Sequence, residues 1–283
     1  MNDFPLISVV IPVYNRELSV ATAIRSTVSL APMPYEVVVV DDGSFDNSSK
    51  VAEAELRKIG CRYTVIVNPR NRGVSYSRNI GVSKASGKWV IFLDSDDEYL
   101  EEAGQALLSC LDDDFDYVAF SYYVNGFKAP APQKIDDLFF EFLNVKFFNT
   151  NTIACKREVF ESLNFREGFP IGEDTDLWAR ILFYKKGVFS DIPFAKYNLE
   201  HKIRVPGRHP FYDITLAELD LSEEIKDKLY SRYKRYCFLQ RCALREVSLC
   251  NLILRFDFKA ALYYMIGVRN YGAFWVISRW LKK

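Results

Sequence analysis

The sequence predicts an α/β fold in which helices cover a mostly parallel sheet, with a helical extension at the C-terminal end. Short apolar runs rich in valine and isoleucine alternate with amphipathic stretches through the first hundred residues. Strands and helices that alternate in this way form a parallel sheet with helices on its faces. Several runs end in polar or acidic residues, and open α/β sheets bind ligands beyond the carboxyl ends of their strands. The 283 residues suffice for one large domain and a helical extension.

In the first half of the chain, apolar runs predict the strands and helical periodicity predicts the helices between them. The first run is interrupted by Pro12, and the helix after it carries Val20, Ile24 and Val28 on one face. Strands are expected at residues 6–14, 35–40, 63–67 and 89–93, and helices at residues 17–30, 46–58 and 74–85.

The second half is less regular, but the same periodicities place its elements. A proline-rich stretch at residues 126–133 predicts a surface loop. Residues 214–254 carry many charges at helical spacing, which predicts two helices packed on the rest of the chain or on a second subunit of a homodimer. Helices are also expected at residues 100–111, 135–143 and 173–184, and strands at residues 117–123, 149–157 and, as two short segments, 187–197.

Composition and charge exclude several classes of function. The 37 basic and 37 acidic residues give a formal net charge of zero, which makes no electrostatic case for nucleic acid as a partner. The six cysteines lack the paired spacing of a zinc site, which indicates reduced thiols in a cytoplasmic protein. The first residues do not have the basic and apolar regions of a signal peptide. No uninterrupted apolar run reaches the roughly 18 residues of a membrane-spanning helix.

An acidic cluster follows the fourth predicted strand. Asp94, Ser95, Asp96 and Asp97 come directly after its last apolar residue. Carboxylates this close repel one another, so a half-buried cluster needs a cation or hydrogen-bond donors to neutralise it. A hard divalent cation held by one or two carboxylates and by substrate phosphates is one explanation. The other is that Asp96 or Asp97 caps the helix expected at residues 100–111.

The C-terminal segment differs in character from the rest of the chain. Residues 260–283 are aromatic, apolar and basic, and they contain no acid. Such a segment can lie in a membrane interface, with Trp275 and Trp280 at headgroup depth and basic side chains on anionic lipid. The alternative is a terminal helix packed on the protein core.

Four stretches, in this order and spacing, resemble the nucleotide-binding half of the family 2 glycosyltransferases, which have the GT-A fold. They are residues 8–15 (SVVIPVYN), 39–44 (VVDDGS), 71–73 (NRG) with 77–81 (SRNIG), and 93–97 (LDSDD). The resemblance implies a GT-A catalytic domain at residues 1–212, in which residues 1–99 bind the nucleotide and residues 100–212 face the acceptor. Residues 213–283 would form the helical region.

The resemblance implies that most of these residues contact a nucleotide-sugar donor. Asp41, and with it Asp42, would hydrogen-bond the base. Arg78 would contact the base or a phosphate, or would instead brace the acidic loop from its helix. The other residues implied in donor binding are Pro12, Val13, Tyr14, Asn15, Arg72, Gly73, Asp94 and Ser95.

The resemblance also implies a metal cofactor. Asp96, the last carboxylate of the Asp-x-Asp element, would ligate Mn²⁺ or Mg²⁺, with Asp97 and His201 as additional ligands. The metal would bridge the two donor phosphates and offset the charge that builds on the leaving nucleoside diphosphate.

A second acidic motif opens the helix expected at residues 173–184. On their own, acids here are ordinary enrichment that favours the helix dipole. The pair Glu173 and Asp174 resembles the Glu-Asp motif of the family, which implies that Asp174 is the base that deprotonates the acceptor and that Glu173 supports it or binds the acceptor. Asp176 is an alternative base. Trp178 can stack on a sugar ring or lie in the core.

The function implied is metal-dependent, inverting transfer of a sugar from a nucleotide donor, with UDP the expected nucleotide, to a glycan or lipid-linked acceptor of a bacterial surface polysaccharide. The enzyme would be cytoplasmic, with peripheral contact to the cytoplasmic face of the inner membrane. One alternative is a nucleotide-sugar-binding protein that has lost catalysis. Another is a nucleotidyltransferase, which would need a glycine-rich phosphate loop where residues 13–16 read VYNR.

Overall fold

The computed structural model describes residues 6–31, 33–124, 126–145, 147–169, 171–198, 211–231 and 234. Residues 1–198 and residues 199–283 form two compact units. The larger unit carries the predicted sheet and nearly all of the predicted site residues, so it is described first.

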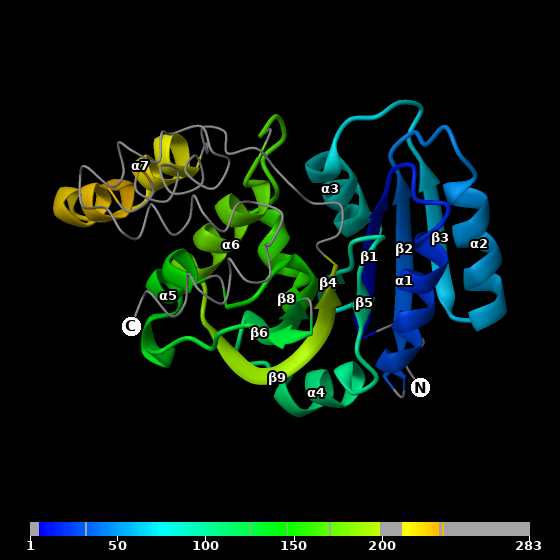
Figure 1. Cartoon of the computed structure of the whole chain (residues 1–283), viewed down its shortest axis with the longest axis horizontal. Coiled ribbons are helices and arrows are strands. Elements are labelled where there is room, and N and C mark those ends of the chain that lie inside the picture. The colour runs from blue at the N-terminus through cyan, green and yellow to red at the C-terminus, as the bar shows by residue number, and fades with distance from the viewer. Residues whose placement is uncertain are drawn as a thin grey trace, which may run out of the picture. The chain divides into compact units, whose positions relative to one another are not determined.

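Among the described residues, nine strands form one sheet. They are β1 (Ile7–Val13), β2 (Tyr35–Asp41), β3 (Arg62–Val67), β4 (Trp89–Phe92), β5 (Glu98–Tyr99), β6 (Tyr117–Val124), β7 (Phe127–Lys128), β8 (Ile153–Lys156) and β9 (Gly187–Tyr197). The order across the sheet is β3-β2-β1-β4-β8-β6-β9-β5 (Figure 1). Strand β7 pairs with β6. The α-helices of this unit are α1 (Val20–Ser26), α2 (Ser48–Ile59), α3 (Val74–Lys84), α4 (Ala103–Cys110), α5 (Leu138–Val145) and α6 (Glu173–Tyr184).

The first half is the parallel, helix-covered sheet that the sequence predicts. Strand β1 pairs in parallel with β2 and β4, and β2 pairs in parallel with β3. Because side chains alternate across a strand, Val9, Ile11 and Val37 lie in one hydrophobic core with Ile24 of α1 and Leu56 of α2. All five of these side chains are fully buried.

Helix α3 packs closely against β1 through a glycine. A Cβ atom added at Gly81 would lie 2.3 Å from Cγ1 of Val10. Only a residue without a side chain allows this approach of helix and strand. The close packing brings the N-terminal turn of α3, which follows Gly73, to the edge of the sheet at which the acidic loops lie.

The second half joins the sheet through antiparallel pairing of β8 with β4 and of β8 with β6. Helix α6 is fixed by an aromatic cluster around Trp178. The Trp178 ring lies 6.1 Å from Phe92 of β4, 6.0 Å from Phe165 and 6.3 Å from Phe148, all edge-on. These contacts place Trp178 in the core and tie α6 to the strand that precedes the acidic cluster.

Several elements differ from the prediction. Glu98 and Tyr99 form β5, which pairs with β9, so the next helix begins at Ala103 and not near residue 100. Residues 187–197 form one curved strand, β9, with a register shift opposite β6, and not two short strands (Figure 1). The predicted loop at residues 126–133 contains β7. The predicted helix at residues 17–30 ends as a 3-10 turn at Thr27–Leu30, and η3 (Thr150–Thr152) precedes β8.

The smaller unit is described over a short range only. A π-helix, η5 (Phe211–Thr215), leads into α7 (Leu216–Glu218), and residues 223–231 are helical. Most of the predicted helical region, the C-terminal segment at residues 260–283 and the predicted ligand His201 lie outside the described residues. Within the described part of the chain, no helix is both long and apolar enough to cross a membrane.

Candidate active site

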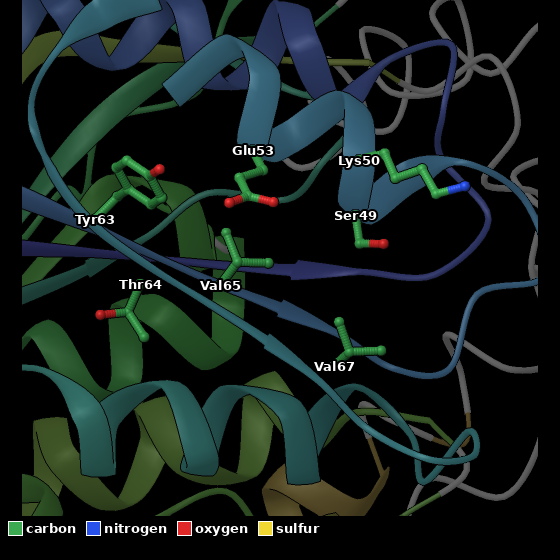
Figure 2. Close-up of a pocket in the computed structure, with 7 residues that line it drawn as sticks. All are labelled: Ser49, Lys50, Glu53, Tyr63, Thr64, Val65 and Val67. Atoms are coloured by element: carbon green, nitrogen blue, oxygen red, sulfur yellow. The ribbon is translucent and has the colours of Figure 1, made fainter. Parts of the chain in front are cut away.

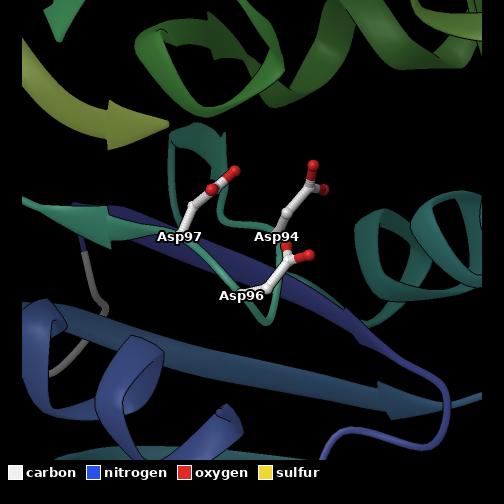
Figure 3. A group of neighbouring side chains, drawn as sticks. All are labelled: Asp94, Asp96 and Asp97. Atoms are coloured by element: carbon white, nitrogen blue, oxygen red, sulfur yellow. The ribbon is translucent and has the colours of Figure 1, made fainter. Parts of the chain in front are cut away.

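The acidic loop between β4 and β5 gathers three carboxylates. Each of Asp94, Asp96 and Asp97 offers an oxygen, and these oxygens lie within 4.8 Å of one another (Figure 3). Asp97 is fully buried, whereas Asp94 and Asp96 are partly exposed. The helix that follows begins at Ala103 and makes no side-chain cap hydrogen bond. The cluster therefore does not serve as a helix cap, which was the alternative that the sequence left open.

Two asparagines from distant parts of the chain hold this loop. Oδ1 of Asn151 accepts a hydrogen bond from the Asp94 backbone N–H at 2.9 Å, and its Nδ2 donates to Asp97 Oδ2 at 2.6 Å. The Asn198 backbone N–H donates to Asp97 Oδ1 at 2.8 Å, and its Nδ2 donates to the Asp96 carbonyl at 2.7 Å. Both the backbone and one carboxylate of the loop are thus fixed by the second half of the fold.

Arg78 of α3 lies between the two acidic motifs. Its side chain is 5% exposed, and its guanidinium donates to Asp94 Oδ1 at 2.8 Å and to Glu173 Oε1 at 3.3 Å. Burial works to lower the pKa of Arg78, but the Asp94 and Glu173 carboxylates outweigh it and leave the pKa raised. Of the two roles that the sequence allowed, these contacts favour the brace. A donor contact of Arg78 stays a prediction.

The acids of α6 differ in their surroundings. Asp176 is fully buried and pairs with Arg180 at 2.5 Å and with Arg166 at 3.5 Å. Glu173 is buried beside Arg78, as described above. Asp174 is partly exposed, and its Oδ1 accepts a hydrogen bond from the Thr175 backbone N–H at 2.7 Å. Of the two bases that the sequence proposed, Asp174 is the one that lies at the surface.

The acids after β2 are buried at the same edge of the sheet. Oδ1 of Asp42 accepts from Asn68 Nδ2 at 2.8 Å, and both of its oxygens accept from the Arg72 backbone N–H at 3.0 Å. The Gly73 backbone N–H donates to Asp42 Oδ2 at 2.7 Å. Oδ1 of Asp41 accepts from the Ser44 backbone N–H at 2.8 Å. Asp42 therefore holds the loop that leads into α3, and its predicted contact with a base is untested.

The loop after β1 is hydrogen-bonded to the loop after β2. Asn15 has a left-handed φ of 52°, its backbone N–H donates to Ser44 Oγ at 2.9 Å, and its Oδ1 accepts from the Phe45 backbone N–H. The Tyr14 and Phe45 rings meet edge-on at 6.3 Å. Nη2 of Arg16 lies 3.8 Å from Asp96 Oδ2, which links this loop to the acidic loop.

Of the other residues predicted to contact the donor, Pro12, Val13 and Ser95 expose little side chain, whereas Arg72 has an exposed guanidinium. Pro12 and Val13 are buried within β1, and Ser95 is 5% exposed. The Arg72 guanidinium lies 3.6 Å from the centre of the Tyr76 ring and 3.6 Å from Glu167 Oε2. Of the residues after β1 that were predicted to contact the donor, Tyr14 and Asn15 are exposed, and the neighbouring Arg16 is exposed as well.

The sequence matches the model of glycosyl transferase family 2 over residues 8–166, more than half of the chain. The chain belongs to glycosyl transferase family 2. The GalNAc(5)-diNAcBac-PP-undecaprenol beta-1,3-glucosyltransferase of Campylobacter jejuni is 26% identical to this glycosyltransferase over 281 residues, which cover 95% of this chain and 85% of that protein. An uncharacterized glycosyltransferase of Haemophilus influenzae is 38% identical over 95 residues, or 34% of this chain and 38% of that protein.

Two solved structures share the fold of this glycosyltransferase. S. aureus TarS 1–349 in complex with UDP superposes with a TM-score of 0.64 and 21% identity, over 79% of this chain and 69% of that chain. The mannosyltransferase PcManGT from Pyrobaculum calidifontis, in complex with GDP-Man and Mn²⁺, gives a TM-score of 0.60 and 18% identity, over 81% of this chain and 69% of that chain. The predicted GT-A fold is confirmed.

A shallow groove of this glycosyltransferase lies apart from the residues of the acidic motifs. It has a volume of about 350 Å³ and is lined by residues of α2 and β3 alone (Figure 2). Its lining residues are Ser49, Lys50, Glu53, Tyr63, Thr64, Val65 and Val67. None of these residues was predicted to bind donor, metal or acceptor.

The functional residues that sequence reasoning missed are Asn151 and Asn198. Both lie in the second half of the sheet-bearing unit, and each bonds the acidic loop through a side-chain amide. The available signal was slight: Asn151 belongs to a polar run at the start of the strand predicted at residues 149–157, and Asn198 directly follows the strand segments predicted at residues 187–197. Nothing local distinguishes either from a surface asparagine.

Proposed function

We propose that this glycosyltransferase transfers a sugar from a nucleoside diphosphate sugar, with UDP as the first nucleotide to test, to a hydroxyl group of a glycan or lipid-linked acceptor. The observation that carries the proposal is that Arg78 joins Asp94 of the acidic loop to Glu173 of α6. A group that binds the donor diphosphate and a group that activates the acceptor must lie side by side, and these contacts put the two motifs in one place. The UDP complex of TarS and the GDP-Man complex of PcManGT support a nucleotide-sugar donor.

The acidic loop fits a hard divalent cation. Carboxylate oxygens are the ligands that Mn²⁺ and Mg²⁺ prefer, and Asp94 and Asp96 are partly exposed and close enough to share one ion. Asp96 would be the main ligand. When bound, the cation supplies electrostatic stabilisation of the departing diphosphate. The Mn²⁺ in the PcManGT complex supports this choice of cofactor.

Asp174 would act as the general base in a direct displacement. The acceptor oxygen forms a bond to the anomeric carbon while the bond from that carbon to the phosphate oxygen breaks. The hydroxyl proton passes to the Asp174 carboxylate, and the electron pair leaves with the nucleoside diphosphate. Attack from the face opposite the phosphate inverts the configuration of the sugar. Glu173, neutralised by Arg78, would hold the start of α6 in place.

The nucleoside would lie against the loops after β1 and β2. Tyr14 is 38% exposed and offers a ring beside Asn15, and Asp41 sits at the carboxyl end of β2. Asp42 would act indirectly, because it fixes the backbone of Arg72 and Gly73. Arg16, 3.8 Å from Asp96, is placed to meet a phosphate.

The acceptor class is proposed from a relative whose match covers 95% of this chain. The name of the Campylobacter jejuni enzyme gives an undecaprenol-linked glycan as its substrate. A lipid-linked acceptor would suit an enzyme at the cytoplasmic face of the inner membrane, held there by the aromatic and basic residues 260–283. That segment, the predicted catalytic domain boundary at residue 212 and the metal role of His201 remain proposals.

The test is calorimetric titration with UDP and GDP, with and without Mn²⁺, followed by assay of UDP release from a panel of UDP-sugars. We expect UDP to bind more tightly with Mn²⁺, and Asp96→Ala to abolish UDP release while the protein stays folded. Asp113→Ala removes an exposed carboxylate that pairs with Lys88 and serves as the matched control. Full turnover by Asp96→Ala would reject the metal assignment, and binding of neither nucleotide would reject the proposed function.

A further inference from the structure

Asp97 is bound differently from the other two acids of the loop. It is 0% exposed, and each of its carboxylate oxygens accepts a short hydrogen bond, from Asn151 Nδ2 at 2.6 Å and from the Asn198 backbone N–H at 2.8 Å. Hydrogen bonds to an ionised carboxylate are among the stronger ones in proteins. If the side chain had to turn to reach a cation and broke one of these bonds, a buried donor would be left unpaired, which is costly.

The donors to Asp97 are themselves held in place. Asn151 is 1% exposed and lies in the 3-10 turn η3, where its backbone N–H donates to Asn149 Oδ1 at 2.9 Å. Thr150 of the same turn accepts a hydrogen bond from Trp178 Nε1 at 3.1 Å, so the turn is tied to α6. The chain of contacts therefore runs from the helix that carries Asp174, through η3, to the acidic loop.

The amide of Asn151 makes two bonds that act together. Its Nδ2 donates to the Asp97 carboxylate while its Oδ1 accepts from the Asp94 backbone N–H. The Asp97 backbone N–H donates in turn to the Asp94 carbonyl at 3.0 Å, which closes the turn. These bonds fix the backbone on both sides of Asp96, and with it the direction in which the Asp96 side chain leaves the loop.

We propose that Asp97 is the anchor of the metal-binding loop and not a metal ligand, and that Asn151 is the positioning residue that holds this anchor. The proposal rests on the proposed function, in which Asp94 and Asp96 bind the cation. Proximity of the three carboxylates alone does not assign the ligands, since a buried carboxylate that is already hydrogen-bonded on both oxygens gains less from a cation than a partly exposed one. In this proposal, the negative charge of Asp97 serves to accept the hydrogen bonds from Asn151 and Asn198.

The sharpest test exchanges the two side chains. In the double variant Asp97→Asn with Asn151→Asp, the new amide at position 97 donates to the new carboxylate at position 151, and the bonds to the Asn198 and Asp94 backbones are kept. The net charge is unchanged and only its position moves. The single variant Asn151→Asp sets two carboxylates against each other, and Asp97→Asn sets two amides against each other. With the wild type and the double variant they complete a double-mutant cycle.

Two quantities are measured for the wild type and the three variants. The first is the melting temperature without metal. The second is the Mn²⁺ dissociation constant in the presence of UDP, obtained from the electron paramagnetic resonance signal of free Mn²⁺. We expect Asn151→Asp to lower the melting temperature by about 5 °C or more and to weaken Mn²⁺ binding by about 10- to 100-fold. The double variant should recover most of both losses. If Asn151→Asp does not fold alone, recovery of folded protein in the double variant reports the same coupling.

The outcomes separate the inference from the proposed function. A double variant that recovers stability but not Mn²⁺ binding shows that the charge at position 97 is itself required, and Asp97 is then a ligand. A double variant no more stable than the single variants rejects the anchor. If the wild type binds no Mn²⁺ with UDP present, the metal part of the proposed function fails, while the melting temperatures still decide whether Asp97 and Asn151 are coupled.

Discussion

Asp94 and Glu173 accept hydrogen bonds from one guanidinium group, that of Arg78, at 2.8 and 3.3 Å. The first acid belongs to the loop after β4 and the second begins α6. Because both carboxylates meet one buried cation, neither motif can move without disturbing the other. The link is electrostatic as well as geometric, since Arg78 is the positive charge that these two acids share.

Arg78→Met should therefore damage both stability and transfer. Removing the cation takes the guanidinium away from the buried Glu173 and the partly exposed Asp94, which should lower the free energy of unfolding by about 3–5 kcal/mol. Arg78→Lys should cost less but should not restore the activity, because an ammonium group does not bridge two carboxylates as a guanidinium does. Chemical denaturation and the sugar-transfer assay measure the two effects.

The matched control for this pair is Arg57→Met. Arg57 is 68% exposed and pairs with Glu53 on the surface of α2, so we expect little change in stability or transfer. Equal effects of Arg78→Met and Arg57→Met would show that the shared guanidinium has no special role.

Asp174→Asn should remove catalysis and spare donor binding. The substitution keeps the size of the side chain but removes the proton acceptor, so kcat should fall by about 10²- to 10⁴-fold. The dissociation constant for UDP with Mn²⁺ and the melting temperature should stay close to those of the wild type. A normal kcat in this variant would exclude Asp174 as the base.

Asp176→Asn should act on folding first. The Asp176 carboxylate is fully buried between Arg180 and Arg166, and its substitution removes the negative charge that both guanidinium groups face, which should lower the free energy of unfolding by about 3–5 kcal/mol. Transfer by the fraction that remains folded should keep a near-normal kcat. If Asp176→Asn unfolds like the wild type but does not turn over, Asp176 is the base and the assignment of Asp174 is wrong.

Gly43→Ala should weaken both the fold and donor binding. Gly43 has a φ of +75°, and a Cβ atom there would lie 2.7 Å from the Arg70 carbonyl carbon. The left-handed backbone and the steric overlap should together lower the free energy of unfolding by about 2–5 kcal/mol. The loop that Asp42 holds would be displaced, so UDP should bind less tightly in a calorimetric titration.

Gly60→Ala separates the two causes. Gly60 has the same φ of +75° after α2, but nothing lies within 4 Å of an added Cβ atom. Its substitution should lower the free energy of unfolding only by the backbone strain, about 1–2 kcal/mol. UDP binding should stay unchanged. Equal costs at both glycines would mean that the loops after β2 and β3 do not pack tightly.

Local patterns were enough to predict most elements of the first half. Buried strands such as β1, β2 and β4 are recognisable as apolar runs, because the tendency of such a run to form a strand depends on neighbours along the chain. The short strand β5 was missed for the opposite reason. Glu98 and Tyr99 become a strand only by pairing with Lys196 and Ala195 of β9, a contact that no local pattern encodes.

For the site, the sequence by itself determined the family, through four stretches in one order and spacing. Its choice of acids, after predicted strands and at the start of a predicted helix, stays a prediction. The sequence left two roles open for Arg78, a donor contact and a brace, and two for Trp178, stacking on a sugar ring and packing in the core. It did not predict a role for Asn151. The tertiary structure places Trp178 in the core and shows the contact of Asn151 with Asp97. For Arg78 it shows the brace, while a donor contact stays a prediction. Asn151 meets Asp97 across 54 positions of the chain and Arg78 meets Glu173 across 95. Partners this far apart are brought together by the packing of whole elements, which is why they carry no signature in the residues around them.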